Sequence, residues 1–320
     1  MTSDGTPIPV NVSNFIRAES DLYFERTVMD GGLGQFYHRM KVVGIDEQTV
    51  VRMNRDTLYS SGVFALDAGP VTVTLPDTGK RFVSMMALSQ DHYAFDVVYA
   101  PVMRTYTRER VGTRYLFLAI RTLVDAADQD DVNRANRLQN SIKVDQANTG
   151  LWEKPNWDEL SQKKVRDALA LLGSLGGLHD LFGTKDEVNP VCHLIGTACG
   201  WGGNPKHAAS YTSVFPKAND GYTIHVLTVR DVPVDSFWSI SVYNSEGYFE
   251  KNDAGIYSLN SLSARPNQDG SFTIQFGGAR ETVPNYLPIT PGWNYTVRLY
   301  KPRQEILDGS WSFPEAQPVT

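Results

Sequence analysis

Hydrophobic residues recur at the spacing of an amphipathic helix near the start of the chain. Phe15, Ala18 and Leu22 lie three or four positions apart, which places their side chains on one helical face. Hydrophobic positions return at the same spacing twice more in the middle of the chain. The pattern predicts three helices, over residues 14–30, 128–142 and 158–175.

Most of the remaining chain alternates hydrophobic and polar residues, which is the pattern of half-buried β-strands. Residues 71–75, Val-Thr-Val-Thr-Leu, alternate strictly and are followed by the turn-forming sequence Pro-Asp-Thr-Gly. Short strands that follow one another through turns are typical of antiparallel sandwiches. The predicted strands cover residues 70–75, 81–88, 94–100, 116–122, 223–229, 237–243, 271–276 and 295–300.

The 320 residues exceed the size at which one hydrophobic core usually stops growing, so two domains are expected. A glycine-rich stretch at residues 196–203 has few bulky side chains, and we expect the chain to bend sharply there between the domains. We therefore predict a helix and β-sandwich over residues 1–125, a helical segment and linker over 126–200, and a jelly-roll or related sandwich over 201–320.

Composition and charge narrow the classes of function. Hydrophobic residues make up 41% and charged residues 21% of the chain, which suits a folded globular protein. The formal net charge is -6, and the charges form no long run of one sign, which argues against nucleic-acid binding and against a polybasic membrane anchor. The first residues lack the basic start and hydrophobic run of a signal peptide, so we expect a cytoplasmic protein.

Sequence motifs for common cofactors are missing. The chain contains no GxxxxGK[ST], GxGxxG, HExxH or CxxC pattern, so we expect neither a nucleotide cofactor nor a structural zinc ion. His38, His193, His207 and His225 are scattered without the spacing of metal ligands. The closest approach to a nucleophile elbow, at residues 196–200, has alanine in the nucleophile position. The sequence therefore predicts no cofactor and no metal site.

Residues 54–59, Asn-Arg-Asp-Thr-Leu-Tyr, gather hydrogen-bonding groups of both signs just before a strand. Arg55 can bind a carboxylate or phosphate through two parallel hydrogen bonds, and Asp56 can act as a base. Asn54 and Tyr59 can add hydrogen bonds to the same ligand. The alternative is that Arg55 and Asp56 hold the domains together through ion pairs and backbone contacts.

Asp91, His92 and Tyr93 are consecutive and form the best acid–base candidate. A histidine has its ordinary pKa near neutrality, and fixed hydrogen-bonding groups beside it can orient it for proton transfer. Neighbours in a strand point to opposite faces, so this arrangement requires a loop at these residues. The alternative is that His92 is a structural or an exposed residue.

Aromatic residues and a lysine in the second half suggest a stacking surface for a flat or sugar-like ligand. Tyr243 and Lys251 can line the mouth of the predicted jelly roll, and Trp201 can act as a lid or anchor an interface. Trp238 alternates as a core residue would, and core packing is also the alternative for Trp201.

Three strings in the second half follow one another in a characteristic order: Phe-Trp-Ser-Ile-Ser-Val-Tyr-Asn at residues 237–244, Asn-Tyr-Leu-Pro at 285–288 and Arg-Leu-Tyr-Lys-Pro-Arg at 298–303. Together they resemble a bacterial family known as domain of unknown function 1214. In the first half, Met-Asn-Arg-Asp-Thr-Leu-Tyr-Ser at 53–60 and Ser-Gln-Asp-His-Tyr at 89–93 resemble its usual partner, domain of unknown function 1254. The resemblance implies an immunoglobulin-like sandwich, central helices and a jelly roll. It implies no settled activity, and many relatives carry export signals.

The leading functional hypothesis is an enzyme that acts on a small polar or anionic molecule in a pocket between the sandwiches by acid–base chemistry. Its predicted catalytic residues are Asp56, Asp91 and His92, and its predicted substrate-binding residues are Asn54, Arg55, Tyr59, Trp201, Tyr243 and Lys251. The alternative is a non-catalytic ligand-binding protein or an assembly protein, such as a homo-oligomer, whose jelly roll supplies aromatic contacts. Both hypotheses need a pocket lined by the same residue types, so the sequence does not separate them.

Overall fold

The computed structural model describes residues 5–48, 51–279 and 283–319. The chain forms two compact units. Unit 1 consists of Met1–Arg39, Tyr59–Thr122 and Asn136–Lys206, and unit 2 consists of Met40–Leu58, Leu123–Ala135 and His207–Thr320. Each unit is thus assembled from separate stretches of chain, whereas the sequence pattern predicted contiguous segments.

Unit 1 contains two β-sheets that face each other. The larger sheet consists, in order, of β1 (Tyr37–His38), β2 (Thr57–Ala65), β7 (Tyr115–Leu123), β4 (Val83–Ser89) and β5 (Ala94–Tyr99). The smaller consists of β6 (Val102–Tyr106), β3 (Val71–Leu75) and β8 (Lys143–Asp145). Hydrophobic residues on the facing sides, among them Val73 of β3, Met85 of β4 and Leu118 of β7, form one core.

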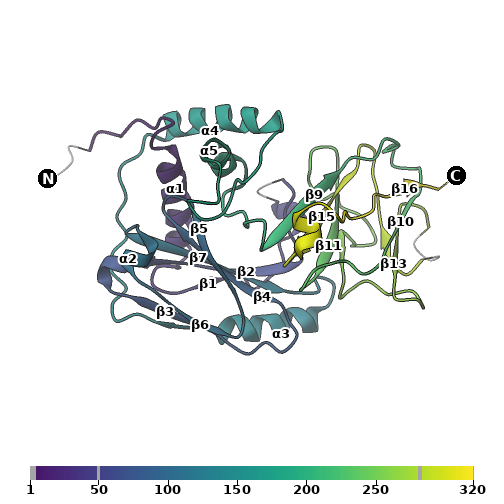
Figure 1. Ribbon diagram of the computed structural model, residues 1–320, viewed down its shortest axis with the longest axis horizontal. Helices are drawn as coiled ribbons and strands as arrows, with labels where there is room; N and C mark the ends of the chain where they lie inside the picture. Colours follow the sequence, from purple (N-terminus) through teal and green to yellow (C-terminus); the bar gives the residue numbers. More distant parts are fainter. Residues whose placement is uncertain (1–4, 49–50, 280–282, 320) are drawn as a thin grey trace. The chain divides into compact units, whose positions relative to one another are not determined.

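Helices cover the other face of the larger sheet. They are α1 (Phe15–Met29) and α5 (Pro190–Gly200), and α4 (Glu159–Ser174) packs on these two helices, as Figure 1 shows. Side chains along a strand alternate between its faces, so Met86 of β4 packs with Phe24 of α1 while its neighbours face the smaller sheet. The strand β4 is therefore buried on both faces. A short helix, α2 (Arg108–Val111), follows β6.

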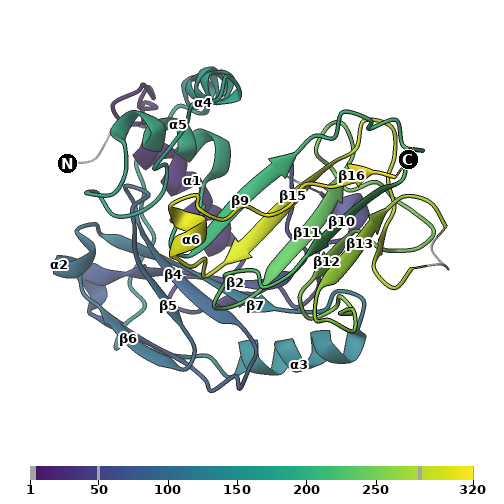
Figure 2. The same ribbon diagram turned by 45° about the vertical axis from the view of Figure 1, so that its right-hand side comes forward.

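Unit 2 is a sandwich of two sheets (Figure 2). One sheet consists, in order, of β14 (Tyr286–Leu287), β13 (Phe272–Phe276), β10 (His225–Val229) and β16 (Gln317–Pro318). The other consists of β12 (Ser258–Asn260), β11 (Trp238–Tyr243), β15 (Asn294–Tyr300) and β9 (Ala209–Val214). Leu227, Ile240 and Phe276 belong to the hydrophobic core between the sheets. The remaining helices are α3 (Gln129–Asn140), which continues across the boundary between the units, and α6 (Gln304–Leu307).

The outward-facing side of β11 and β15 is polar and yet buried. Ser241 and Arg298 point away from the hydrophobic core, but each is at most 4% exposed. They are buried because residues 52–56, here called the cover segment, lie across these strands. The alternation of the strands therefore creates a second, polar interior in unit 2.

The predicted class, mainly β with two sandwiches and a helical segment, is confirmed. The expectation of a sharp bend over residues 196–203 is wrong in its first part, because α5 continues to Gly200. Asn189 caps this helix by accepting a hydrogen bond from the Val191 N–H at 3.0 Å. A Cβ atom on Gly196 would come within 2.9 Å of the Leu181 Cβ, so this glycine makes room for a neighbouring loop.

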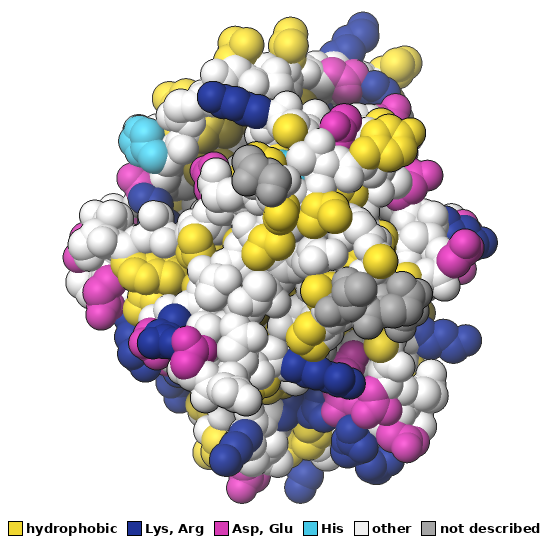
Figure 3. Space-filling view, turned by 90° about the vertical axis from the view of Figure 1, so that its right-hand side faces the viewer, with side chains coloured by type: hydrophobic (Ala, Val, Ile, Leu, Met, Phe, Trp, Pro, Cys, Tyr) yellow, Lys and Arg dark blue, Asp and Glu magenta, His cyan; other side chains and the backbone are white. Residues whose placement is uncertain are grey.

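No helix in the described ranges is long and hydrophobic enough to cross a membrane. On the face of the molecule seen in Figure 3, hydrophobic side chains lie in separate groups among polar atoms. Basic and acidic side chains are interspersed along the margins of that face. This distribution agrees with a sequence that has no long run of one charge.

Candidate functional site

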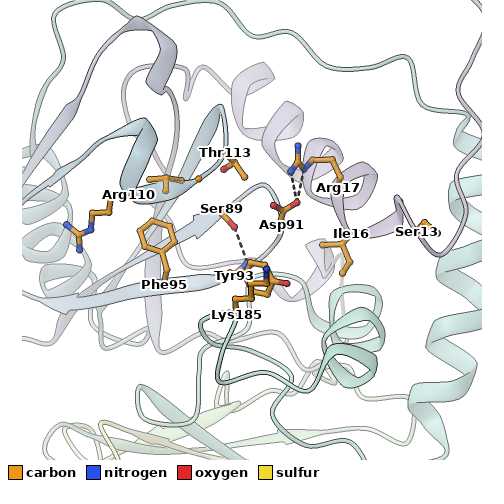
Figure 4. Close-up of a pocket in the computed structure, with 12 residues that line it drawn as sticks. Ser13, Ile16, Arg17, Ser89, Asp91, Tyr93, Phe95, Arg110, Thr113 and Lys185 are labelled. Atoms are coloured by element: carbon orange, nitrogen blue, oxygen red, sulfur yellow. Dashed lines mark hydrogen bonds and ion pairs between the residues drawn. The ribbon is translucent and has the colours of Figure 1, made fainter.

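A cavity of about 480 Å3 lies in unit 1 (Figure 4). Its walls come from the start of α1, the turn between β4 and β5, the end of α2 and the loop that precedes α5. Small-molecule sites usually have volumes of roughly 300–1,000 Å3, so this cavity is large enough to hold a ligand. The charged residues of its walls are Arg17, Asp91, Arg110 and Lys185.

Arg17 and Asp91 form an ion pair in the cavity wall. Arg17 Nη2 and Nε both donate to Asp91 Oδ1, at 2.5 and 3.1 Å. The two side chains are 39% and 44% exposed, so water screens the pair. Exposed pairs of this kind stabilise a fold by only about 0–1 kcal/mol. A ligand that competes for either partner can therefore open the pair at little cost.

The two other cations of the cavity differ in their partners. Arg110 Nη2 donates to Asp96 Oδ2 at 2.9 Å, and the Arg110 guanidinium lies over the ring of Tyr106. Lys185 is exposed and makes no hydrogen bond or ion pair with any described residue. Lys185 is thus a positive charge of the cavity wall that no described acidic residue neutralises.

Asp21 and Gln90 form a buried network behind the cavity wall. Gln90 Nε2 donates to Asp21 Oδ1 at 2.8 Å, and Trp157 Nε1 donates to Asp21 Oδ2 at 2.9 Å. The Gln90 N–H donates to Thr113 Oγ1 at 3.1 Å, which joins the network to the cavity wall. Burial raises the pKa of Asp21, while the hydrogen bonds from Trp157 and Gln90 act to lower it.

The substitution Asp21→Asn is expected to make the stability of the protein less dependent on pH. The pKa of Asp21 in the folded protein lies above its ordinary value of 3.8, so the folded state holds this proton more tightly than the unfolded chain. The resulting stabilisation is present below the ordinary pKa and is lost as pH rises through the folded-state pKa. Free energies of unfolding in urea, measured from about pH 4 to about pH 7, check this. Equal pH profiles for the variant and the wild type would contradict it.

His92 follows Asp91 in the sequence but points into the interior of unit 1. Its backbone is left-handed, with φ 62°, and the residue is 1% exposed. The Gly202 N–H donates to His92 Nε2 at 2.8 Å, so the ring proton lies on Nδ1, which donates to Thr197 Oγ1 at 2.9 Å. Burial, assisted by His193, lowers the pKa of His92 to about 3. The predicted loop is present, but a buried neutral ring with both nitrogens engaged is not placed to exchange protons with a ligand.

Trp201 and Tyr59 also lie away from the cavity. The Trp201 ring stacks on Tyr23 and on His92, with centroid distances of 4.5 and 5.4 Å. Tyr59 lies under the guanidinium of Arg121, which is 5.7 Å from the ring centroid. Neither residue contributes to the cavity wall. The contacts of Trp201 agree with the core-packing alternative.

Asp56 and Tyr243 lie in unit 2 near Arg298, which was not among the predicted site residues. Arg298 Nη2 donates to the Tyr243 hydroxyl at 2.6 Å and to the Arg52 carbonyl at 2.9 Å. The Tyr243 hydroxyl in turn donates to the Met53 carbonyl at 2.7 Å. These bonds tie the cover segment to the polar side of β11 and β15.

This polar interior is closed to solvent. Asp56 and Arg298 are 1% and 4% exposed. Burial raises the pKa of Asp56, and the charge of Arg298 opposes this effect. Burial by itself would lower the pKa of Arg298, but Tyr243 and other neighbouring acidic groups raise it, so the guanidinium stays charged. The network is therefore suited to holding the cover segment in place within unit 2.

The remaining predicted residues of unit 2 do not converge on one site. Asn54 Nδ2 donates to the Tyr300 hydroxyl at 2.8 Å, at the side of the Arg298 network. Arg55 points elsewhere, with its guanidinium 5.4 Å from the ring centroid of Tyr257. The Lys251 side chain is 76% exposed, and its Nζ atom lies 3.6 Å from Asp46 Oδ2.

The structure thus gathers three of the predicted residues in the polar interior of unit 2 and places one, Asp91, in the cavity of unit 1. Arg17 and Lys185 were missed because no local pattern marks them, and only the fold brings them to one cavity. Arg298 lies in one of the three strings quoted above, which was the available signal for it. Among the described residues, no group of three His, Cys, Asp or Glu side chains is placed to hold a metal ion.

Two models of known protein families match the chain, one in its first half and one in its second half. Residues 33–107 match the family described as "Protein of unknown function (DUF1254)", and residues 212–304 match the one described as "Protein of unknown function (DUF1214)". The chain belongs to the DUF1254/DUF1214 family. The resemblance inferred from the sequence is confirmed, and neither family description names an activity.

Two solved structures share the fold of this DUF1254/DUF1214 protein. The VPA0106 protein from Vibrio parahaemolyticus has a TM-score of 0.72 and 17% identity, and the alignment covers 97% of this chain and 98% of that one. An uncharacterized protein from Burkholderia cenocepacia has a TM-score of 0.54 and 14% identity, with 96% and 87% covered. At these identities the likeness concerns the fold alone. No curated protein matches the chain.

Proposed function

We propose that unit 1 binds a small organic anion in the cavity beside Asp91. The observation that carries this proposal is Lys185, a cation in the cavity wall without an acidic partner among the described residues. An anionic group of a ligand supplies the missing partner, and a charged acceptor roughly doubles the strength of the hydrogen bond. Arg17 adds a second donor group once the ligand competes with Asp91 for it.

The rest of the cavity wall suits an organic molecule better than a bare inorganic ion. Ile16, Phe95 and Val111 give it hydrophobic surface, and the hydroxyl groups of Ser13 and Thr113 lie in the same wall. Figure 4 shows Phe95 toward one side of the cavity and Arg17 toward the other. Figure 4 also shows Arg110 on the Phe95 side and Ile16 on the Arg17 side, so both sides of the cavity offer a cation and a hydrophobic side chain to an organic anion.

Ligand binding is favoured here over acid–base catalysis by His92. Among the residues that the structure describes, no histidine lines the cavity, and His92 itself is enclosed by Thr197, Gly202 and Trp201. The carboxylate of Asp91 is held by Arg17. The non-catalytic alternative that the sequence left open is therefore the one these contacts support, although in unit 1 and not in the jelly roll. The pocket expected between the sandwiches stays a prediction.

Lys185→Ala is expected to weaken the binding of an organic anion by about tenfold, which corresponds to the loss of one charge-assisted hydrogen bond of about 1.4 kcal/mol. Isothermal titration calorimetry with benzoate and phenyl phosphate measures the effect, with benzamide as the neutral comparison. The matched control is Lys164→Ala, which removes an exposed lysine of α4 outside the cavity wall. Equal affinity of Lys185→Ala and Lys164→Ala, or equal binding of benzamide and benzoate to the wild type, would show that the proposal is wrong.

A further inference from the structure

His193, in the first turn of α5, has an unusual pair of partners. The residue is 1% exposed, and each of its ring nitrogens faces a backbone carbonyl oxygen. Nδ1 lies 2.8 Å from the Leu181 oxygen, and Nε2 lies 3.1 Å from the Asp91 oxygen. A carbonyl oxygen only accepts hydrogen bonds, so both nitrogens of this ring are placed as donors.

The proton count of the ring follows from these two contacts. A neutral imidazole carries one N–H, so its second nitrogen would point a lone pair at a carbonyl oxygen within hydrogen-bonding distance. Both neutral tautomers leave one buried acceptor unpaired in this way, which is unfavourable in a protein interior. An imidazolium donates to Leu181 and Asp91 at the same time. The geometry therefore fits the charged form of His193.

The two rings that stack on His193 are compatible with a charge on its ring. Tyr93 lies parallel to it, with a centroid distance of 4.8 Å and an interplanar angle of 7°, and the face of a tyrosine ring attracts cations. His92 lies on it at 5.4 Å and is neutral, because its Nε2 accepts from the Gly202 N–H. The pair thus holds one charge and not two.

Other groups act on this charge in both directions. The carboxylate of Asp91, in the turn that supplies one of the two carbonyls, favours it, whereas Arg17 offsets part of that effect. Asp180, which precedes the other carbonyl residue Leu181, is itself paired with Lys206 and His179. Burial and the amino-terminal end of α5 oppose a cation. The two charge-assisted hydrogen bonds are the contribution that only the imidazolium form makes in full.

We propose that His193 is held as an imidazolium behind the cavity and that its charge makes the cavity prefer anions to neutral molecules of the same shape. The charge of His193 acts on the cavity across a single residue, Tyr93, which lines the cavity and whose ring stacks on His193. The first part concerns the ligand-free protein alone. The second part rests on the proposed function, because it assigns to His193 a role in the specificity of that cavity.

The first part is tested on the wild type by long-range 1H–15N correlation spectra of 15N-histidine-labelled protein at neutral pH. We expect the pattern of an imidazolium for His193 and that of a neutral ring protonated on Nδ1 for His92. Spectra of His193→Gln and of His179→Gln, which replaces an exposed histidine of unit 1, assign the signals. A neutral pattern for His193 in the wild type would overturn the proposal, whether or not any ligand binds.

The second part is tested by the ratio of the affinities for benzoate and benzamide. We expect this ratio to fall by about tenfold in His193→Gln, since one nearby charge is removed, and to stay unchanged in His179→Gln. A merely structural role would weaken both ligands alike and leave the ratio unchanged, which would overturn the specificity role even if His193 is an imidazolium. If benzoate does not bind the wild type, the proposed function fails, while the spectra still decide the charge of His193.

Discussion

Replacing Arg298 with methionine is expected to lower the free energy of unfolding of unit 2 by about 3–5 kcal/mol, because it leaves at least two buried acceptors without a donor and each such loss costs about 1–3 kcal/mol. The substitution removes the guanidinium that binds the Tyr243 hydroxyl and the Arg52 carbonyl. It also leaves the carboxyl group of Asp56 in the interior, 1% exposed, without the charge that opposes its desolvation. Methionine fills much of the volume, so the loss reports on the polar contacts more than on a cavity.

Hydrogen exchange of the β11 and β15 amides in the native protein measures this effect on unit 2 by itself. The matched control is Arg303→Met, because Arg303 forms an ion pair with Asp235 in which both side chains are 54% exposed. That variant is expected to lose about 0–1 kcal/mol. If Arg298→Met and Arg303→Met lose the same amount, the polar interior does not stabilise unit 2 as described.

The second large effect is expected from Arg166→Met in α4, which removes the charged partner of a buried glutamate in α1 and leaves Gln162 as its remaining side-chain donor. Arg166 Nε and Nη2 donate to the two carboxylate oxygens of Glu19, each at 2.6 Å. The Glu19 side chain is 0% exposed, whereas that of Arg166 is 28% exposed. We expect the free energy of unfolding of unit 1 to fall by about 2–4 kcal/mol, somewhat less than for a fully enclosed pair.

Urea denaturation followed by hydrogen exchange of the α1 amides checks this result. Lys163→Met is the control on the same helix, since Lys163 pairs with Asp167 and the two side chains are 66% and 59% exposed. Its loss is expected to be about 0–1 kcal/mol. A double variant, Glu19→Gln with Arg166→Met, is expected to recover part of the stability because the buried charge is removed together with its partner. Failure to recover any would point to lost packing and not to an unpaired carboxylate.

The protein therefore contains two kinds of polar cluster that look alike in the sequence. The Arg298 network is enclosed, and its guanidinium binds the Tyr243 hydroxyl and the backbone of the cover segment. The cavity beside Asp91 is open, and one of its cations has no partner among the described residues. The difference between a network that stabilises the fold and a set of groups that can bind a ligand is the degree of burial. Burial cannot be inferred from the residue types alone.

Local patterns alone determined much of the architecture. The spacing of Phe15, Ala18 and Leu22 predicted a helix that the structure places at Phe15–Met29, and the alternation over residues 71–75 predicted the strand Val71–Leu75. These predictions succeed because helix and strand periods depend on the few residues nearest in sequence. The series of short alternating strands also predicted two sandwiches, in agreement with the family strings, and the strand order confirms them.

Only the tertiary structure decided which polar residues share a site. The motif at residues 54–59 is one string in the sequence, yet Asp56 enters the Arg298 network, Arg55 turns to Tyr257, and Tyr59 belongs to unit 1. Arg17 and Lys185, far apart in the chain, line one cavity. The physical reason is that burial, desolvation and partner choice depend on contacts between distant segments. The sequence pattern determined the class of fold and which familiar motifs are missing, whereas the tertiary structure decided that Asp91 faces a cavity and that His92, the next residue, faces the core.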